Sequence, residues 1–129
     1  SSDPAWDIGA VIAGYLALWL RSIPLIGGVP ASDVMGKAGV PLDQVQCSLQ
    51  AFWHAYMHET ALDEGTASDL LLRSMSYSAA RLIQHEEEHL QTASAMTRRT
   101  DLILDVSQNI LLAPGQAARL LAGISEPAT

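Results

Sequence analysis

The sequence predicts an all-α fold, a helical bundle of four to five helices with one long helix, in a single helical domain over residues 1–129. Two observations lead to this prediction. Apolar residues make up 49% of the chain and aromatic residues only 5%, and the apolar part is dominated by alanine and leucine, which lose little rotamer freedom in a helix. Apolar positions also recur at helical spacing along much of the chain.

The first predicted helix covers residues 4–23, after a capping Ser2 or Asp3 and before Pro24, which disfavours helical backbone in the residue that precedes it. Its apolar run over residues 8–20 is 13 residues long, which is too short to span a bilayer. Acidic rather than basic residues precede this run, unlike in a signal peptide. We therefore expect a buried helix and no membrane partner.

Two helices are predicted next, a short one over residues 32–37 and a longer one over residues 41–64. Pro41 suits the first turn of the longer helix, where a missing N–H costs little, and Gly65 is expected to end it. The apolar positions of this helix fall on one stripe, which we expect in the core: Leu42, Val45, Leu49, Phe52, Trp53, Tyr56 and Thr60.

The long helix is predicted over residues 67–99, with Thr66 and Asp69 as a capping box. At the rise of an α-helix it would be about 50 Å long. A helix of this length in a small chain commonly extends past its own core to meet a partner subunit, so we expect a homodimer. Further helices are predicted over residues 101–112 and 114–123.

Charge and cysteine content restrict the function. Acidic residues outnumber basic ones by 14 to 7, giving a net charge of -7, so we expect no direct binding of nucleic acid, whose phosphates require basic residues. The single cysteine, Cys47, can form neither an internal disulfide nor a multi-cysteine metal site, which fits a cytoplasmic setting. Its helical position is typical of a small packing residue.

The four histidines form two pairs with helical i, i+4 spacing, His54 with His58 and His85 with His89. Two such pairs have the chemistry to bind a transition metal or haem. The run HEEEH around Glu86 also matches the zinc-peptidase pattern, although no convincing third ligand is visible. The plainer interpretation of both pairs is a solvated surface, and His54 and His58 lie roughly 150° from the apolar stripe of their helix.

Glu86 differs from its acidic neighbours because it lies in the middle of the apolar stripe of the long helix. A buried carboxylate without a partner is costly, so we expect a partner, Arg81 or a histidine, or else a functional role. The candidates to line a pocket between helices are Trp19, Trp53 and Tyr56, whose spacing equally suits plain core packing.

Three segments carry a family resemblance: WLRSIPLI at residues 19–26, AGVPLDQVQCSLQAFWHAYMHE at 38–59, and RRTDLILDVSQNILLAPGQAARLLAG at 98–123. In this order they resemble the N-terminal region of PucR/CdaR-type bacterial transcription regulators. The second segment is the most specific, and the third resembles the junction into that family's central domain. The resemblance implies a non-enzymatic sensory or dimerisation module that transmits a ligand or partner signal to an attached regulatory domain.

Two other functions remain open at this point. The first is a stand-alone metal- or haem-binding helical protein that uses the two histidine pairs. The second is a small metallohydrolase built on the HEEEH helix. Both require the histidines to meet further ligands in space.

Overall fold

The computed structural model describes residues 3–92 and 97–125, and within these ranges the chain is all-helical, without strands. The all-α prediction is therefore confirmed, with six α-helices instead of four to five among the described residues. The helices are α1 (Pro4–Arg21), α2 (Ala31–Val34), α3 (Leu42–Thr60), α4 (Glu64–Thr92), α5 (Arg98–Leu112) and α6 (Pro114–Ala117). A 3-10 turn, η1 (Met35–Lys37), follows α2, and a π turn, η2 (Ala118–Ala122), follows α6.

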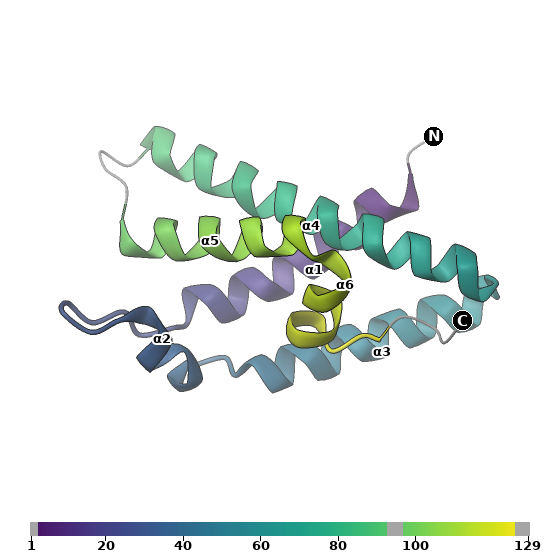
Figure 1. Ribbon diagram of the computed structural model, residues 1–129, viewed down its shortest axis with the longest axis horizontal. Coiled ribbons are helices and arrows are strands. Elements are labelled where there is room, and N and C mark those ends of the chain that lie inside the picture. The colour runs from purple at the N-terminus through teal and green to yellow at the C-terminus, as the bar shows by residue number, and fades with distance from the viewer. Residues whose placement is uncertain (1–2, 93–96, 126–129) are drawn as a thin grey trace.

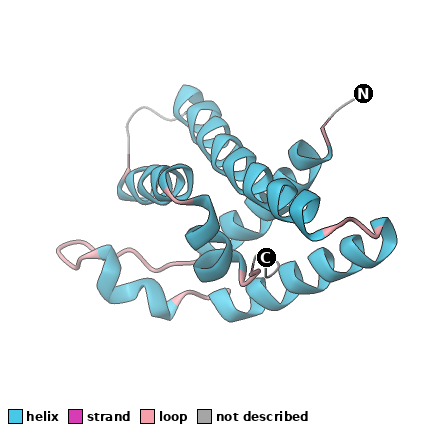
Figure 2. Cartoon of the chain, turned by 45° about the vertical axis from the view of Figure 1, so that its right-hand side comes forward, coloured by secondary structure: helices cyan, strands magenta, loops and turns pink. Residues whose placement is uncertain are grey.

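Helix α1 lies between α3 and an antiparallel hairpin of α4 and α5 (Figure 1). The C-terminal elements α6 and η2 lead from the end of α5 toward α3, and Figure 2 shows the described helices joined by loops. One apolar core connects these layers. Its largest fully buried apolar side chains come from five of the helices and the loop after α1: Ile12, Leu16, Leu20, Ile23, Val34, Leu49, Leu71, Met75, Ile103 and Ile110.

Helix α1 begins where the sequence predicts, with Asp3 as its cap: the Asp3 carboxylate accepts the backbone N–H of Ala5 at 3.0 Å. It ends at Arg21, two residues earlier than predicted. The Ser22 hydroxyl donates to the carbonyl of Trp19 at 2.8 Å and accepts the N–H of Val40 at 2.9 Å. The hydroxyl thus ties the end of α1 to the segment that leads into α3.

The boundary between α3 and α4 corrects the predicted one at Gly65. Helix α3 stops at Thr60, because Ala61 takes a left-handed conformation with φ 51° and ψ 40°. Asp63 then caps α4, since its carboxylate accepts the N–H of Thr66 at 2.7 Å. Gly65 lies inside the first turn of α4. The predicted capping box at Thr66 was therefore wrong, because it placed the start of the helix one turn too late.

The long helix is also shorter than predicted, since α4 ends at Thr92 and not at residue 99. Arg98 and Arg99 open α5 instead, and the side chain of Thr97 caps that helix by accepting the N–H of Thr100 at 3.2 Å. The predicted stripe positions Ala93 and Met96 lie outside the described residues. Because α5 folds back along α4, the apolar stripe of the long helix packs within its own chain, against α1 and α5.

The backbones of α1 and α4 approach each other most closely at Gly9. A Cβ atom at this position would lie 2.8 Å from the Cβ of Tyr77 and 2.9 Å from the carbonyl oxygen of Ser74. Ser74 and Ser78 are both fully buried on the facing side of α4, where their hydroxyls donate to carbonyls of their own helix. Small residues on both helices therefore permit this contact.

Arg73 of α4 holds the first turn of α1 through Asp3. Its Nη2 donates to Asp3 Oδ1 at 2.9 Å and its Nε to Asp3 Oδ2 at 3.2 Å, while its Nη1 bonds Asp69 one turn earlier on α4. The hydrogen bond from Arg73 and, second, that from the Ala5 N–H lower the pKa of Asp3 below its ordinary value of 3.8. Asp3 thus works both as helix cap and as ion-pair partner.

Gly9→Ala is expected to lower the free energy of unfolding by about 1–3 kcal/mol, because the added methyl group would overlap Tyr77 and the α4 backbone. Gly65→Ala, in the first turn of α4, is the control. A Cβ at Gly65 would meet only the Asp63 carboxylate at 3.6 Å, an ordinary contact distance, so alanine should stabilise the helix by about 0.5–1 kcal/mol. Urea denaturation followed by circular dichroism measures both values, and equal effects of the two substitutions would contradict the close packing at Gly9.

Asp3→Asn is expected to destabilise the chain at neutral pH and to lose this effect in acid. Because folding depresses the pKa of Asp3, its stabilising contribution is present above the ordinary value of 3.8 and disappears as the pH falls below it. Thermal melts between neutral pH and about pH 2.5 should show the melting curves of variant and wild type converging. Asp105→Asn, at an exposed site on α5, is the control. A difference that persists unchanged at low pH would refute the role of the ionised carboxylate.

Candidate functional site

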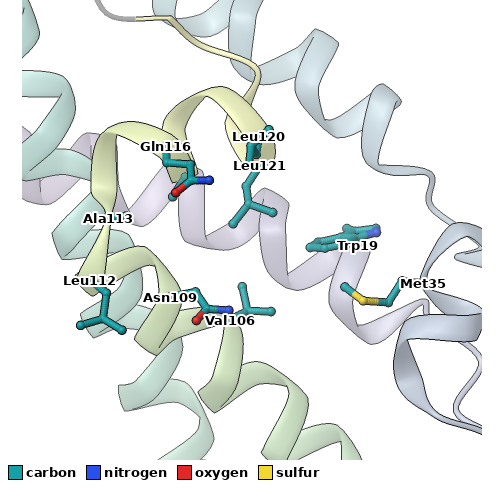
Figure 3. A pocket seen from close by; sticks show the side chains of 10 residues that line it. Trp19, Met35, Val106, Asn109, Leu112, Ala113, Gln116, Leu120 and Leu121 are labelled. Carbon is teal, nitrogen blue, oxygen red and sulfur yellow. The ribbon is translucent and has the colours of Figure 1, made fainter.

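A pocket of about 380 Å³ opens where α5 turns into α6 (Figure 3). Trp19 of α1 and Met35 of η1 form one side of it. The end of α5, α6 and η2 form the other side. The residues that line it are Trp19, Met35, Val106, Asn109, Leu112, Ala113, Gln116, Ala117, Leu120 and Leu121.

The turn between α5 and α6 creates the pocket. Ala113 leaves the helical region, with φ −146° and ψ 72°, because the proline at position 114 disfavours helical backbone in the residue before it. The chain therefore changes direction and α6 starts at an angle to α5. Val106 and Asn109, three residues apart on α5, then face Gln116 and Leu120 across this corner (Figure 3).

Two glutamines of α3 hold the far wall of the pocket in place. The side chain of Gln46 donates to the Leu120 carbonyl at 2.9 Å, and that of Gln50 donates to the Gly123 carbonyl at 2.7 Å. Gly123 has a positive φ of 69°, and a Cβ there would lie 2.8 Å from the Gln50 amide nitrogen. The π turn before it is a geometry that is frequent at functional sites.

The lining of the pocket is apolar apart from two amides. None of the ten lining residues is charged, and Asn109 and Gln116 supply the polar groups. Trp19 is 3% exposed and closes the inner side, whereas Leu112 and Leu120 are 75% and 60% exposed at the rim. An apolar cavity with a few hydrogen-bonding groups is the usual form of a small-molecule site.

Of the three predicted pocket residues, only Trp19 lines this pocket. Trp53 and Tyr56 lie on α3, where their rings stack with centroids 6.5 Å apart and an interplanar angle of 18°. Trp53 is 4% exposed and belongs to the core. For this pair the plain core interpretation of the spacing fits better than the pocket interpretation.

Most of the pocket residues were not singled out from the sequence, namely Met35, Val106, Asn109, Leu112, Gln116, Leu120 and Leu121. One signal for them exists in the sequence. The run NILLAPGQAARLL contains more leucines than a single buried face of a short helix can hold, and in the structure Leu111, Leu112 and Leu120 are exposed. Such an excess indicates an apolar surface outside the main core.

The histidine pairs lie on separate helices with α1 between them. His54 and His58 are exposed on α3, as the helical wheel predicts, and His85 and His89 are exposed on α4. Within residues 3–92 and 97–125, no three His, Cys, Asp or Glu side chains are grouped closely enough to hold a metal ion. The described part of a single chain therefore does not assemble the four-histidine site for a metal or haem.

Glu86 is 1% exposed and is paired, as the sequence predicts for a carboxylate on an apolar stripe. Its partner was wrongly predicted. The carboxylate accepts a hydrogen bond at 2.5 Å from Nη2 of Arg21, in the last turn of α1, whereas Arg81 donates to Gln84. Arg21 and Glu86 are 65 residues apart in the sequence, so only the packing of α1 on α4 brings them together.

Two more arginines bind the same end of α1. Arg99 donates to the carbonyl oxygens of Leu20 at 2.6 Å and of Ile23 at 2.9 Å. Because α1 ends at Arg21, no further helical turn follows to supply N–H donors to these oxygens. Arg98 donates to two carbonyls of the following loop, at 2.5 Å each. We refer to Arg21, Arg98 and Arg99 as the α1 clasp, because together they join the end of α1 to α4 and α5.

Comparison with known proteins assigns no family to this chain, because no family model, no curated protein and no solved structure matches it. In the described part of the chain, no helix combines the length and the apolar character needed to cross a membrane. The residues of the chain and the pocket that they form are therefore the basis for proposing a function.

Arg21→Ala is expected to lower the free energy of unfolding by at least about 2 kcal/mol, because it leaves the Glu86 carboxylate buried without its partner. The double variant Arg21→Met/Glu86→Leu removes both charges and should lie within about 1 kcal/mol of wild type. Asp69→Asn is the control for an exposed pair and should cost at most about 0.5 kcal/mol. Urea denaturation gives all three values, and a double variant as unstable as Arg21→Ala would argue against the pairing as the cause.

Proposed function

We propose that this chain is a non-enzymatic sensory and dimerisation module, which binds a small ligand in the pocket and passes the signal to an attached regulatory domain. The observation that supports this function is that two separate parts of the chain form the wall of the pocket. One side consists of Trp19 in α1 and Met35 in η1, and the other side is the C-terminal segment from α5 to η2. A ligand between them contacts both parts of the chain at once.

Such a position suits signalling by population shift. A ligand that contacts α1 and the C-terminal segment stabilises the arrangement in which both walls fit it, and its differential affinity for this arrangement sets the size of the shift. The C-terminal wall falls within residues 98–123, the segment that resembles the junction into the central domain of PucR/CdaR-type regulators. A change in this wall would therefore reach an attached domain directly.

The lining defines the class of ligand. Without a charged side chain in the lining, a charged ligand would lose its hydration and gain no ion pair, so the ligand is neutral. The side-chain amides of Asn109 and Gln116 each offer a donor and an acceptor, which match a carbonyl, hydroxyl or amide group on an otherwise apolar molecule. The single cysteine suits a module in the reducing cytoplasm.

Nile red, a neutral apolar dye, is the probe for this pocket. In a Trp6→Phe/Trp53→Phe background Trp19 is the only tryptophan, and bound dye should quench its fluorescence in a saturable way. Gln116→Phe places a ring in the pocket and should weaken dye binding at least about tenfold, whereas Gln108→Phe, exposed on α5 and outside the lining, should leave it unchanged. Hydrogen exchange at η2 should slow when the dye binds.

Two results would contradict the proposed function. Equal dye affinity of the Gln116→Phe and Gln108→Phe variants would show that the dye binds elsewhere. Saturable binding without any change in exchange at η2 would show that a ligand in the pocket does not act on the C-terminal segment.

A further inference from the structure

Helix α1 is apolar on nearly all sides, yet one of its faces is uncovered in the single chain. Gly14 is exposed and Leu18 is 55% exposed, while Ala10, Val11 and Ala17 beside them are only half-buried. A helix that is apolar around its whole circumference is normally covered on every side. We refer to these five residues, with Asp7 and Arg21 at their two ends, as the outer face of α1.

The outer face contains both a projection and a recess. Leu18 projects from it, and a hollow of about 80 Å³ lies next to it, between α1 and α4. A Cβ at Gly14 would meet nothing within 4 Å, so the face is open at its centre. The residues around the hollow are Ala10, Ala13, Gly14 and Ala17 of α1 and Arg81, Leu82 and His85 of α4.

The residues of the outer face are arranged symmetrically about Gly14. Asp7 and Arg21 each lie seven residues from it, on opposite sides, and Ala10 and Leu18 each lie four residues from it. In an antiparallel pair of identical helices that cross at Gly14, residues at equal distances on opposite sides face each other. Asp7 then faces Arg21, and the Leu18 projection faces the hollow at Ala10.

We propose that the outer face of α1 binds the outer face of a second copy of this chain, antiparallel, with the two-fold axis at Gly14. In this dimer Leu18 of each copy enters the hollow of the other, and Asp7 pairs with the partner's Arg21. A two-fold axis forms each of these contacts twice. A parallel arrangement would instead place Asp7 opposite a second Asp7, and such like-charge contacts are unfavourable.

The charges favour a second copy over an unrelated partner. Asp7 is exposed and forms no ion pair within residues 3–92 and 97–125. Arg21 binds Glu86 through one Nη atom, but its side chain is 44% exposed and the guanidinium carries further N–H donors. It can therefore hold Glu86 of its own chain and Asp7 of the other chain together, which connects the interface to the α1 clasp.

This inference rests on the proposed function only in that two copies of the chain associate. The dimer interface and the ligand pocket are tested separately. The ligand pocket contains Trp19, which lies on the inner side of α1, and none of the seven residues of the outer face. The sequence led us to expect the dimer contact on the long helix. Here α4 contributes only Arg81, Leu82 and His85, at the edge of the contact.

Cysteine cross-linking tests the position of the axis. In a Cys47→Ser background, Gly14→Cys places the two thiols next to each other across the two-fold axis, within the range of a disulfide. Mild oxidation of the 129-residue chain should convert it to a covalent dimer at least about tenfold faster than Ala55→Cys, an exposed control on α3. Equal cross-linking rates for the two variants would overturn the proposed axis.

Sedimentation equilibrium tests the contact itself. Leu18→Glu buries two carboxylates in the interface and should raise the dimer dissociation constant at least about 100-fold. Leu111→Glu, at a site 47% exposed on α5, should leave the constant unchanged. Because Leu18 is 55% exposed in the single chain, circular dichroism should show both variants folded.

Three other outcomes are decisive. Wild-type protein that stays monomeric at about 0.5 mM overturns the interface and the dimerisation part of the proposed function, because a stable dimer has a dissociation constant well below this concentration; the ligand-binding part is tested by the dye alone. A dimer that Leu18→Glu leaves intact overturns it as well. Loss of Nile red binding with an intact, Leu18-dependent dimer would instead refute the proposed function and leave the interface standing.

Discussion

The ion pair between Arg21 and Glu86 is the constraint on which the arrangement of the helices depends. Glu86 is 1% exposed in the middle of the apolar face of α4, and a carboxylate there is tolerable only with a cation beside it. The cation, Arg21, comes from the last turn of α1, while the ion pair between Asp3 and Arg73 joins the first turn of α1 to α4. Between these two ion pairs, Gly9 packs closely against α4. The three contacts together fix one register of α1 on α4.

The α1 clasp carries this constraint to the rest of the molecule. Arg99 binds the carbonyls of Leu20, in the last turn of α1, and of Ile23, just after the helix, and thereby positions the start of α5. Helix α5 is followed by the turn at Ala113 that forms the pocket. Trp19, on the inner side of the pocket, lies in the same last turn of α1 as Arg21. Leu18 of the proposed interface is its neighbour in the sequence but points outward. Ligand and partner copy would thus act on opposite sides of one short segment.

The candidate site was predictable only in part. Trp19 was named from the sequence, but it was indistinguishable there from Trp53, because aromatic residues at helical spacing look alike whether they line a cavity or fill a core. Glu86 was recognised as a buried group in need of a partner, since a charge on an apolar stripe is a local pattern. Arg21 was not recognised as that partner, because 65 residues separate the two and several other cations were nearer in the sequence.

The sequence by itself determined the helical class, the approximate extent of most helices and the buried face of α3, except that Thr60, expected on that face, is exposed. Rotamer entropy, proline and apolar spacing all act locally. The sequence placed His54 and His58 correctly on the surface for the same reason. The tertiary structure decided where α4 ends, which cation neutralises Glu86, and which residues line the pocket. These features depend on contacts between segments far apart in the chain, and their energies arise only when the helices pack against one another.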